Sequence, residues 1–238
     1  MKSRTFVLVH GVWHGGWCWS RLAGILTARG HRVSAITQTG LGERAHLLSA
    51  DITLETFVDD IVQHMTFEDL SDVILVGHSF GGAPATGVAD RIPERITKLI
   101  YLDAIMLNSG ETWFDLLPEE LARDRAKLAE ESSGGLSLPP APVQSFGITE
   151  PEDAAFLEPR LTPHPFRTFT TGLTLSGPVG NGLPAAYIQC TQPAYPPAKI
   201  ALERARQRSW PVAQIRTGHD AMVTAPQGLA DLLETLAL

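Results

Sequence analysis

Cysteine is scarce in this chain, which has two in 238 residues. Small scaffolds that depend on cross-links are dense in cysteine, so this fold must be held by a hydrophobic core. Cys18 and Cys190 could pair, but nothing in their spacing indicates it. Two thiols in a cytosolic chain are ordinarily free, and we expect both to be free here.

Long apolar runs and an excess of positive charge are missing as well. Hydrophobic residues make up 44% of the chain and no run is long enough to cross a bilayer. The net charge of −7 argues against a nucleic-acid partner or an anionic membrane surface. Residues 1–9 are too short and too strand-like for a signal peptide. We therefore expect a soluble cytoplasmic protein with neither of those partners.

The most informative stretch that is present is VILVGHSFGG, at residues 73–82. An aliphatic strand runs into G-x-S-x-G, and small, helix-compatible residues follow. This strand–turn–helix context is that of a nucleophile elbow, in which Ser79 takes a strained backbone conformation above the carboxyl edge of a parallel sheet. Side chains at Gly77 or Gly81 would collide with a neighbouring strand or helix. A glycine-rich turn that merely contains a serine is the plainer alternative.

Further short apolar runs predict the rest of a parallel sheet. Strands are expected at 5–9, 32–36, 98–102, 185–190 and 212–216. Between them, helical spacing predicts one helix ending at Gly30, a crossover helix over 53–70, a charged helix ending at Arg208 and a terminal helix over 227–236. The βαβ opening implies right-handed connections. The expected fold class is α/β, a mostly parallel sheet flanked by helices.

Residues 105–182 differ in composition from the rest. They contain the proline-rich segment 138–142 and a charged helix over about 113–131. A second helix start follows, where Thr149 and Glu152 fit a capping box with Pro151 in the first turn. No strand alternation is visible here. We predict a helical lid at 105–182, inserted into an α/β core made of residues 1–104 and 183–238.

A serine hydroxyl needs a base to take its proton, and imidazole is the usual one. Of the eight histidines, His219 lies just beyond the last predicted strand and downstream of the serine. That order matches the Ser, acid, His order of this kind of fold. The alternative for His219 is a surface loop histidine. His78 is expected to be structural, while His10 and His14 either line the pocket or only pack.

Two backbone N–H groups must stabilise the oxyanion of a tetrahedral intermediate. Phe80 follows the nucleophile and is expected to supply one of them. Val12 follows the first strand and is expected to supply the other, with Gly11 leaving room for the substrate oxygen.

The acid of the triad is the hardest assignment. The strand before the histidine ends in residues 190–193, Cys-Thr-Gln-Pro, which include no carboxylate. Asp103 ends the strand after the elbow strand, and neighbouring strands are about 5 Å apart, so it can reach His219. A buried Asp that caps the following turn is the alternative. In that case Thr191 or Gln192 would orient the histidine.

The motifs together resemble the α/β-hydrolase superfamily. The stretches concerned are FVLVHGVWHGGWCW, VILVGHSFGG, YIQCTQP and GHDAMVTAP. The resemblance is greatest to the branch of plant methylesterases, salicylate-binding esterases, hydroxynitrile lyases and their bacterial esterase relatives. It implies hydrolysis of a carboxylic ester through an acyl-Ser79 intermediate, with no metal and no cofactor.

Two departures from the branch affect this reading. The plant members have an Asp after the Cys-Thr pair, where this chain has Gln192, and this favours Asp103 as the acid. The hydroxynitrile lyases have a threonine and a lysine where this chain has Gly11 and Asp220. Without the lysine no cation is available for a departing cyanide, which argues against lyase activity.

The predicted function is a serine carboxylesterase acting on a small to medium apolar ester, with an aryl or pyrethroid-like group. The predicted pocket residues are Gly11, Trp13, His14, Phe80, Trp113, Phe114 and Leu117. The aromatic residues among them could instead form lid core. The alternatives are a lactone or polyketide-tailoring hydrolase and a non-catalytic small-molecule receptor. The basic cluster at 204–208 is expected to be a solvated helix face, and a homodimer stays open.

Overall fold

A six-stranded parallel sheet forms the centre of the computed structural model, which describes residues 3–237. The strand order is β2-β1-β3-β4-β7-β8. The strands are β1 (Thr5–Val9), β2 (Arg32–Ile36), β3 (Val73–His78), β4 (Ile96–Leu102), β7 (Ala185–Cys190) and β8 (Val212–Ile215). Every residue of β3 is buried, as the continuous apolar run predicts for a central parallel strand. The predicted α/β class is confirmed.

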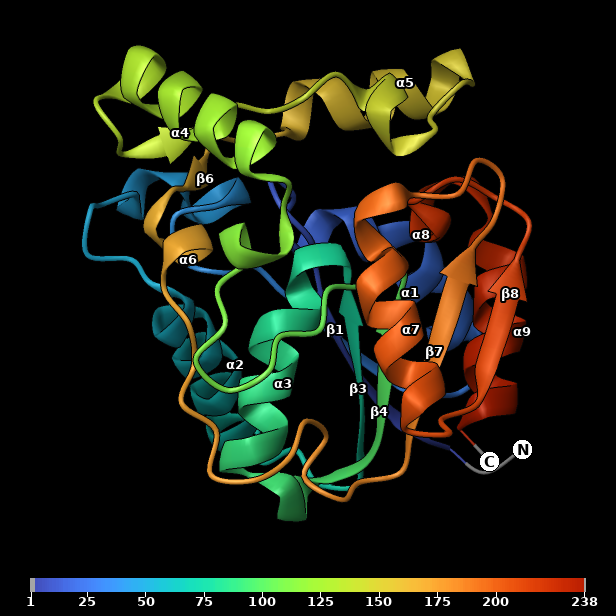
Figure 1. The fold of residues 1–238 in the computed structure, drawn as a ribbon. Helices are drawn as coiled ribbons and strands as arrows, with labels where there is room; N and C mark the ends of the chain where they lie inside the picture. The colour runs from blue at the N-terminus through green and yellow to red at the C-terminus, as the bar shows by residue number, and fades with distance from the viewer. Residues whose placement is uncertain (1–2, 238) are drawn as a thin grey trace.

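Helices cover both faces of this sheet (Figure 1). On one face lie α2 (Leu54–Phe67), α3 (Gly82–Arg91) and α7 (Lys199–Gln207). On the other face α1 (Ser20–Ala28) packs against α9 (Pro226–Leu236), with the short α8 (Ala221–Thr224) beside them. Gly30 follows α1 with a φ of +87°, a left-handed conformation suited to a helix end. No helix within residues 3–237 is both long and apolar enough to span a membrane.

The strand register brings the predicted site to one edge of the sheet. Val9 pairs with Gly77, and His78 pairs with Leu102. Leu102 also pairs with Ile188 of β7. Since the strands are parallel, the residues just after β1, β3, β4, β7 and β8 all lie at the same carboxyl edge.

Residues 105–182 extend over this edge and down one side of the core: α4 and α5 lie above the edge in Figure 1, and the part after α6 runs to the far end of α3, where Ser176 and Asn181 bond it. Their elements are α4 (Glu119–Ser133), β5 (Ser137–Leu138), α5 (Pro151–Leu157), β6 (His164–Pro165) and α6 (Arg167–Thr170). β5 and β6 form a small antiparallel sheet, which the sequence did not predict because two-residue strands are too short to show alternation. The helix predicted from about 113 begins at Glu119 instead, directly after Pro118.

The capping box predicted for α5 is wrong. The N-cap of this helix is Glu150, which makes no side-chain capping bond, and the Thr149 hydroxyl contacts Glu150 instead. Pro151 does open the helix, as predicted. A capping box is present on α2, where Thr53 and Thr56 bond reciprocally. The sequence did not reveal it because threonine, rather than Glu or Gln, occupies the third helical position.

Short 3-10 turns account for much of the remaining chain. They are Gly16–Trp19, Gly42–Leu47, Ser79–Gly81, Pro93–Arg95, Phe114–Leu116, Val143–Phe146, Glu158–Arg160 and Pro196–Ala198. Cys18 and Cys190 are buried and free.

Two buried or half-buried arginines tie residues 105–182 to the core. Arg204 of α7 pairs with Glu111 at 2.6 Å and donates to the Met106 carbonyl, so the prediction of a solvated face is wrong at this position. Its side chain is only 15% exposed, because Glu111 and the Met106 carbonyl, which belong to a distant segment of the chain, cover it. Arg21 of α1 likewise bonds Asp153 of α5 and the Val223 carbonyl.

Candidate active site

Ser79 lies at a strained turn between β3 and α3. Its φ is +52°, in the left-handed region that a serine seldom adopts, and it is 4% exposed. A Cβ at Gly81 would lie 2.5 Å from the His10 carbonyl oxygen, and one at Gly77 would lie 2.8 Å from the Gly81 carbonyl oxygen. Both glycines are therefore required by close backbone packing, as the elbow motif predicts.

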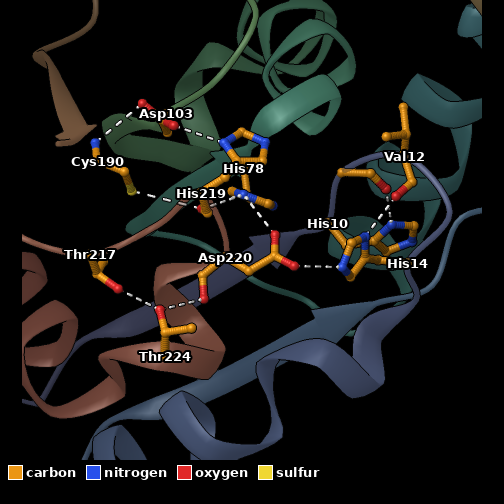
Figure 2. Close-up of polar contacts among 11 residues, drawn as sticks. His10, Val12, His14, His78, Asp103, Cys190, Thr217, His219, Asp220 and Thr224 are labelled. Atoms are coloured by element: carbon orange, nitrogen blue, oxygen red, sulfur yellow. Dashed lines mark hydrogen bonds and ion pairs between the residues drawn. The ribbon is translucent and has the colours of Figure 1, made fainter. Parts of the chain in front are cut away.

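His219 and Asp103 meet at this edge through a short hydrogen bond. His219 Nδ1 donates to Asp103 Oδ2 at 2.7 Å, and the Cys190 N–H donates to the other oxygen at 3.2 Å (Figure 2). Asp103 also has a positive φ, of +44°, because the chain turns sharply as it leaves β4. This bond fixes the tautomer with the proton on Nδ1 when the ring is neutral, leaving Nε2 as an acceptor.

The alternative orienting residues lie elsewhere. The Thr191 hydroxyl donates to the Ile215 carbonyl, and the Gln192 N–H donates to the Thr217 carbonyl. Both bonds hold the loop after β7 against the loop after β8. Neither reaches the His219 ring.

Two aromatic residues and a carbonyl fix the His219 ring from outside the sheet. The ring stacks on Tyr195 with centroids 3.7 Å apart. The backbone N–H of His219 donates to the Phe146 carbonyl. His219 Nε2 is buried and has no partner among residues 3–237. It is not hydrogen-bonded to Ser79 Oγ in this arrangement, and such bonds commonly tighten only when substrate binds.

The loop after β1 passes directly over Ser79. A Cβ at Gly11 would lie 2.6 Å from Ser79 Cβ and 3.2 Å from Oγ, so only glycine leaves this space open. His10 Nδ1 donates to the Gly11 carbonyl and Nε2 accepts the Gln38 N–H. Burial lowers the pKa of His10 to about 3, so the ring is neutral and holds the loop rather than lining a pocket.

His14 and Asp220 form a buried ion pair beneath the site (Figure 2). His14 Nδ1 faces the Val12 carbonyl at 2.6 Å and Nε2 faces Asp220 at 3.1 Å. With acceptors on both nitrogens, the ring is held as an imidazolium. Burial acts to lower the pKa of His14, but the Asp220 carboxylate outweighs it and the pKa is raised. His14 was predicted to line the pocket, and this bonding places it in a different role.

Asp220 keeps its charge despite complete burial. Burial alone would raise its pKa, but the charges and hydrogen bond from His14 dominate and lower the pKa to about 2. The His78 ring lies between Asp220 and His219, and its Nε2 donates to the His219 carbonyl. Burial keeps the pKa of His78 well below its usual value, and the expectation of a structural role fits these contacts.

Three of these groups lie close enough together to be considered as metal ligands. The ligand atoms of His78, His219 and Asp220 fall within 4.8 Å of one another. The His78 proton and one Asp220 oxygen already have protein partners, however. The grouping is explained by these hydrogen bonds.

A buried cluster of aromatic side chains packs on Phe80, the residue after Ser79. Phe80 packs against Trp113, with ring centroids 5.9 Å apart, and against Phe169. Phe114 stacks on Phe169, and Leu117 is half-buried nearby in the chain. Trp13 contacts Phe146 rather than this group. The sequence missed four rings that contact Phe80 or His219: Phe146 of the turn 143–146, His164 of β6, Phe169 of α6 and Tyr195 after β7.

A model of the alpha/beta hydrolase family matches residues 6–232. This match spans the sheet, the elbow and the His219 loop whose geometry is given above. The chain therefore belongs to the α/β-hydrolase family.

Curated relatives place it among esterases of this family. The carbendazim-hydrolyzing esterase of Nocardioides sp. (strain SG-4G) is 36% identical over 98% of this chain and 99% of its own length. Methylesterase 10 of Arabidopsis thaliana is 28% identical over 98% of this chain and 91% of its own length. The predicted resemblance to plant methylesterases and bacterial esterases is confirmed.

Solved structures share the fold. An extracellular α/β-hydrolase from a Paenibacillus species, described as homologous to tobacco salicylic acid binding protein 2, aligns with a TM-score of 0.86 and 24% identity, covering 98% of both chains. A pyrethroid hydrolase aligns with a TM-score of 0.75 and 23% identity, covering 99% of this chain and 98% of its own. At these identities the likeness establishes the fold alone.

Proposed function

We propose that this chain hydrolyses carboxylic esters through a covalent acyl-Ser79 intermediate, with His219 as general base and Asp103 as the acid that orients it. The observation that supports this most directly is the 2.7 Å bond from His219 Nδ1 to Asp103 beside a buried, unpaired Nε2. An imidazole with one nitrogen fixed and the other free can take the serine proton and return it to the leaving group.

In the proposed mechanism Ser79 Oγ attacks the ester carbonyl while His219 takes its proton. The Val12 and Phe80 N–H groups stabilise the oxyanion, each contributing about 3 kcal/mol of barrier reduction. His219 then protonates the departing alcohol, and water repeats the sequence to release the acid. The imidazolium that forms is stabilised by Asp103.

The proposed substrate is a small to medium ester with an apolar, aryl-bearing portion. Support comes from the aromatic cluster formed by Phe80, Trp113, Phe114 and Phe169. The names of two similar proteins, a carbendazim-hydrolyzing esterase and a pyrethroid hydrolase, agree with a substrate of this class.

Hydrolysis of p-nitrophenyl esters of increasing acyl length tests this function. Wild type is expected to turn over with an optimum in chain length that measures the pocket, and Ser79→Ala is expected to lose at least about 10⁴-fold in kcat. Ser79→Ala removes only the nucleophilic oxygen, so its melting temperature serves as the folding control. If wild type turns over none of these esters but binds them, the receptor alternative holds instead.

A further inference from the structure

We propose that Arg125, on helix α4 above the sheet, is a specificity-determining residue that binds an oxygen acceptor, a carboxylate above all, at the end of the substrate remote from the reacting ester. The inference rests on the proposed ester hydrolysis and adds a substrate class to it.

Arg125 is a cation without a protein partner. Its Nε is buried and makes no hydrogen bond within residues 3–237. Its neighbours on the same helix behave differently: Arg123 pairs with Glu119 and Lys127 pairs with Glu131, all of them largely exposed. Arg125 is half-buried and has no carboxylate partner among residues 3–237, although the chain carries a net charge of −7. A buried donor that has no partner in the free protein is a place for a ligand acceptor.

Two side chains, those of Trp113 and Tyr195, connect Arg125 with the proposed site. Its guanidinium carbon lies 5.1 Å from the centroid of the Trp113 ring. Trp113 in turn packs on Phe80, the residue after the nucleophile. The charge of Arg125 also bears on Tyr195, whose ring stacks on His219. Burial raises the pKa of Tyr195 to about 12, and the positive charge of Arg125 opposes that rise.

Arg125 lines a groove between α4 and the proline-rich segment 138–142, with a volume of about 320 Å³. Asp124 is the one carboxylate in the lining, and it makes no ion pair with Arg125 among the described residues. Trp13 lines it, and Trp13 directly follows Val12 in the oxyanion loop. Leu121 and Leu128 line it as well and are 37% and 46% exposed, so an apolar surface is left uncovered there.

These features together describe one occupant. An apolar body would cover the leucines and prolines of the groove, and an oxygen acceptor on it would reach the guanidinium. The two terminal nitrogens of the guanidinium present parallel donors, a geometry that a carboxylate fills with both oxygens. The Trp113 face holds the guanidinium in place without neutralising its charge.

Paired substrates test the proposal on both sides of the ester bond. The pairs are p-nitrophenyl pentanoate with p-nitrophenyl hemiglutarate, and p-tolyl acetate with p-carboxyphenyl acetate. Within each pair, the ratio of kcat/KM for the carboxylate ester to that for the apolar ester is compared among wild type, Arg125→Gln and Arg125→Lys. Lys127→Gln is the matched control, because it removes one cation from the same helix.

In at least one pair the ratio is expected to fall about 10- to 100-fold in Arg125→Gln, mainly through KM, with partial recovery in Arg125→Lys and no change in Lys127→Gln. Hydrolysis of the apolar member should persist in Arg125→Gln, which separates loss of recognition from loss of folding. Unchanged ratios in both pairs would overturn the proposal while leaving ester hydrolysis intact. Failure of wild type on all four esters would instead overturn the proposed function.

Discussion

His219 donates from one ring nitrogen to a carboxylate at 2.7 Å and has no partner for the other among residues 3–237. His78 also has a ring nitrogen without a partner, but its bonded nitrogen faces a carbonyl rather than a carboxylate. His10 has partners on both nitrogens and His14 has acceptors on both. His78 donates to a carbonyl and is held neutral by burial. At the scale of residues, only His219 among these four combines an acid partner with a free acceptor at the elbow.

Replacing Asp103 by Asn tests the orientation of that ring. The amide would favour the wrong tautomer, with the proton on Nε2, so kcat is expected to fall about 10⁴-fold with little change in KM. The measurement is steady-state kinetics on a p-nitrophenyl ester across pH. Asp51→Asn is the control, because Asp51 is exposed. Retention of more than a tenth of the wild-type kcat would transfer the orienting role to another group.

Gly11→Ala tests the space over the nucleophile. The added Cβ would lie 2.6 Å from Ser79 Cβ. Because Ser79 Cβ is bonded directly to the backbone and cannot rotate aside, the oxyanion loop must move away. Activity is expected to fall at least about 100-fold, as for loss of an oxyanion donor. Gly24→Ala, where an added Cβ meets nothing within 4 Å, is the matched control. Equal activity in the two variants would contradict this placement of the loop.

At the residue scale the sequence predicted Ser79 and His219 from motif context and Asp103 from its place at a strand end, and the structure brings His219 and Asp103 into a hydrogen bond. The sequence could not identify Tyr195 or Phe146. Tyr195 reaches His219 through a loop that follows β7, and Phe146 reaches it from the inserted segment. Nothing local in either stretch encodes such a contact. His14 was misplaced because its partner, Asp220, is 206 positions away in the chain.

The buried pair of His14 and Asp220 joins the loop after β1 to the loop after β8. His14 holds the Val12 carbonyl in the loop after β1, and Asp220 directly follows His219 in the loop after β8. The pair therefore fixes the distance between the proposed oxyanion donor and the proposed base. At the scale of elements this is a structural link that the family motifs do not by themselves predict.

Asp220→Asn tests how much this ion pair contributes to the free energy of unfolding. Leaving the His14 cation buried without its counter-charge is expected to lower the free energy of unfolding by about 3–5 kcal/mol. A double variant with His14→Gln should recover part of that loss, since no uncompensated charge remains. Urea unfolding of the four proteins measures the coupling. Additive losses in the double variant would contradict a charged pair.

The strands at 5–9, 32–36 and 185–190 were predicted to the residue, whereas β4 begins at Ile96 rather than 98 and β8 ends at Ile215 rather than 216. Short runs that are mostly apolar were enough to locate them, although Lys98 of β4 and Gln214 of β8 are polar. The helices of the inserted segment were predicted less well. α4 begins six residues later than expected, after Pro118, and α5 lacks its predicted cap. β5 and β6 exist only because Ser137 and Leu138 meet residues 164–165 in space. Short elements of this kind depend on contacts that a local pattern does not carry.

Across the whole molecule, burial of neutral histidines should govern stability toward acid. Burial lowers the pKa of His10 to about 3 and holds those of His78 and His164 well below the usual 6.5. Below pH 6.5 the unfolded chain binds protons at these positions that the folded chain does not. Stability must therefore fall as pH falls, by roughly 1.4 kcal/mol per pH unit for each histidine.

Asp220 and His14 also contribute to the pH dependence of stability. Asp220, with its pKa lowered to about 2, contributes stability that is lost as pH falls from about 4 to 2. His14 has a raised pKa, so its contribution is complete below pH 6.5 and is lost only as pH rises through the raised value. Neither cancels the loss between pH 6 and 4.

We expect urea unfolding midpoints to fall steeply from pH 6 to pH 4, with close to three protons taken up on unfolding. His164→Gln should reduce that number by about one. Glutamine is chosen because it can still accept the hydrogen bond that the Trp13 N–H donates to His164. A midpoint that stays level over this range would contradict the burial of these rings.

The sequence predicted the parallel sheet and an insertion before β7, but not how the insertion lies on the core. That arrangement depends on distant pairs such as Arg204 with Glu111 and Arg21 with Asp153. The sequence suggested that Arg204 was a solvated residue, because an arginine in an amphipathic helix looks the same whether or not a partner arrives from elsewhere. The boundaries proposed for the lid, 105 and 182, stay a prediction.

The central claim is that Ser79 is a nucleophile activated by His219, and covalent trapping tests it most directly. Wild type, Ser79→Ala and His219→Ala would be treated with a fluorophosphonate and followed by intact mass and peptide mapping. We expect one phosphonyl group per wild-type chain, on Ser79, none on Ser79→Ala, and labelling slowed by orders of magnitude in His219→Ala. Labelling at the same rate in His219→Ala, or none in wild type, would contradict it.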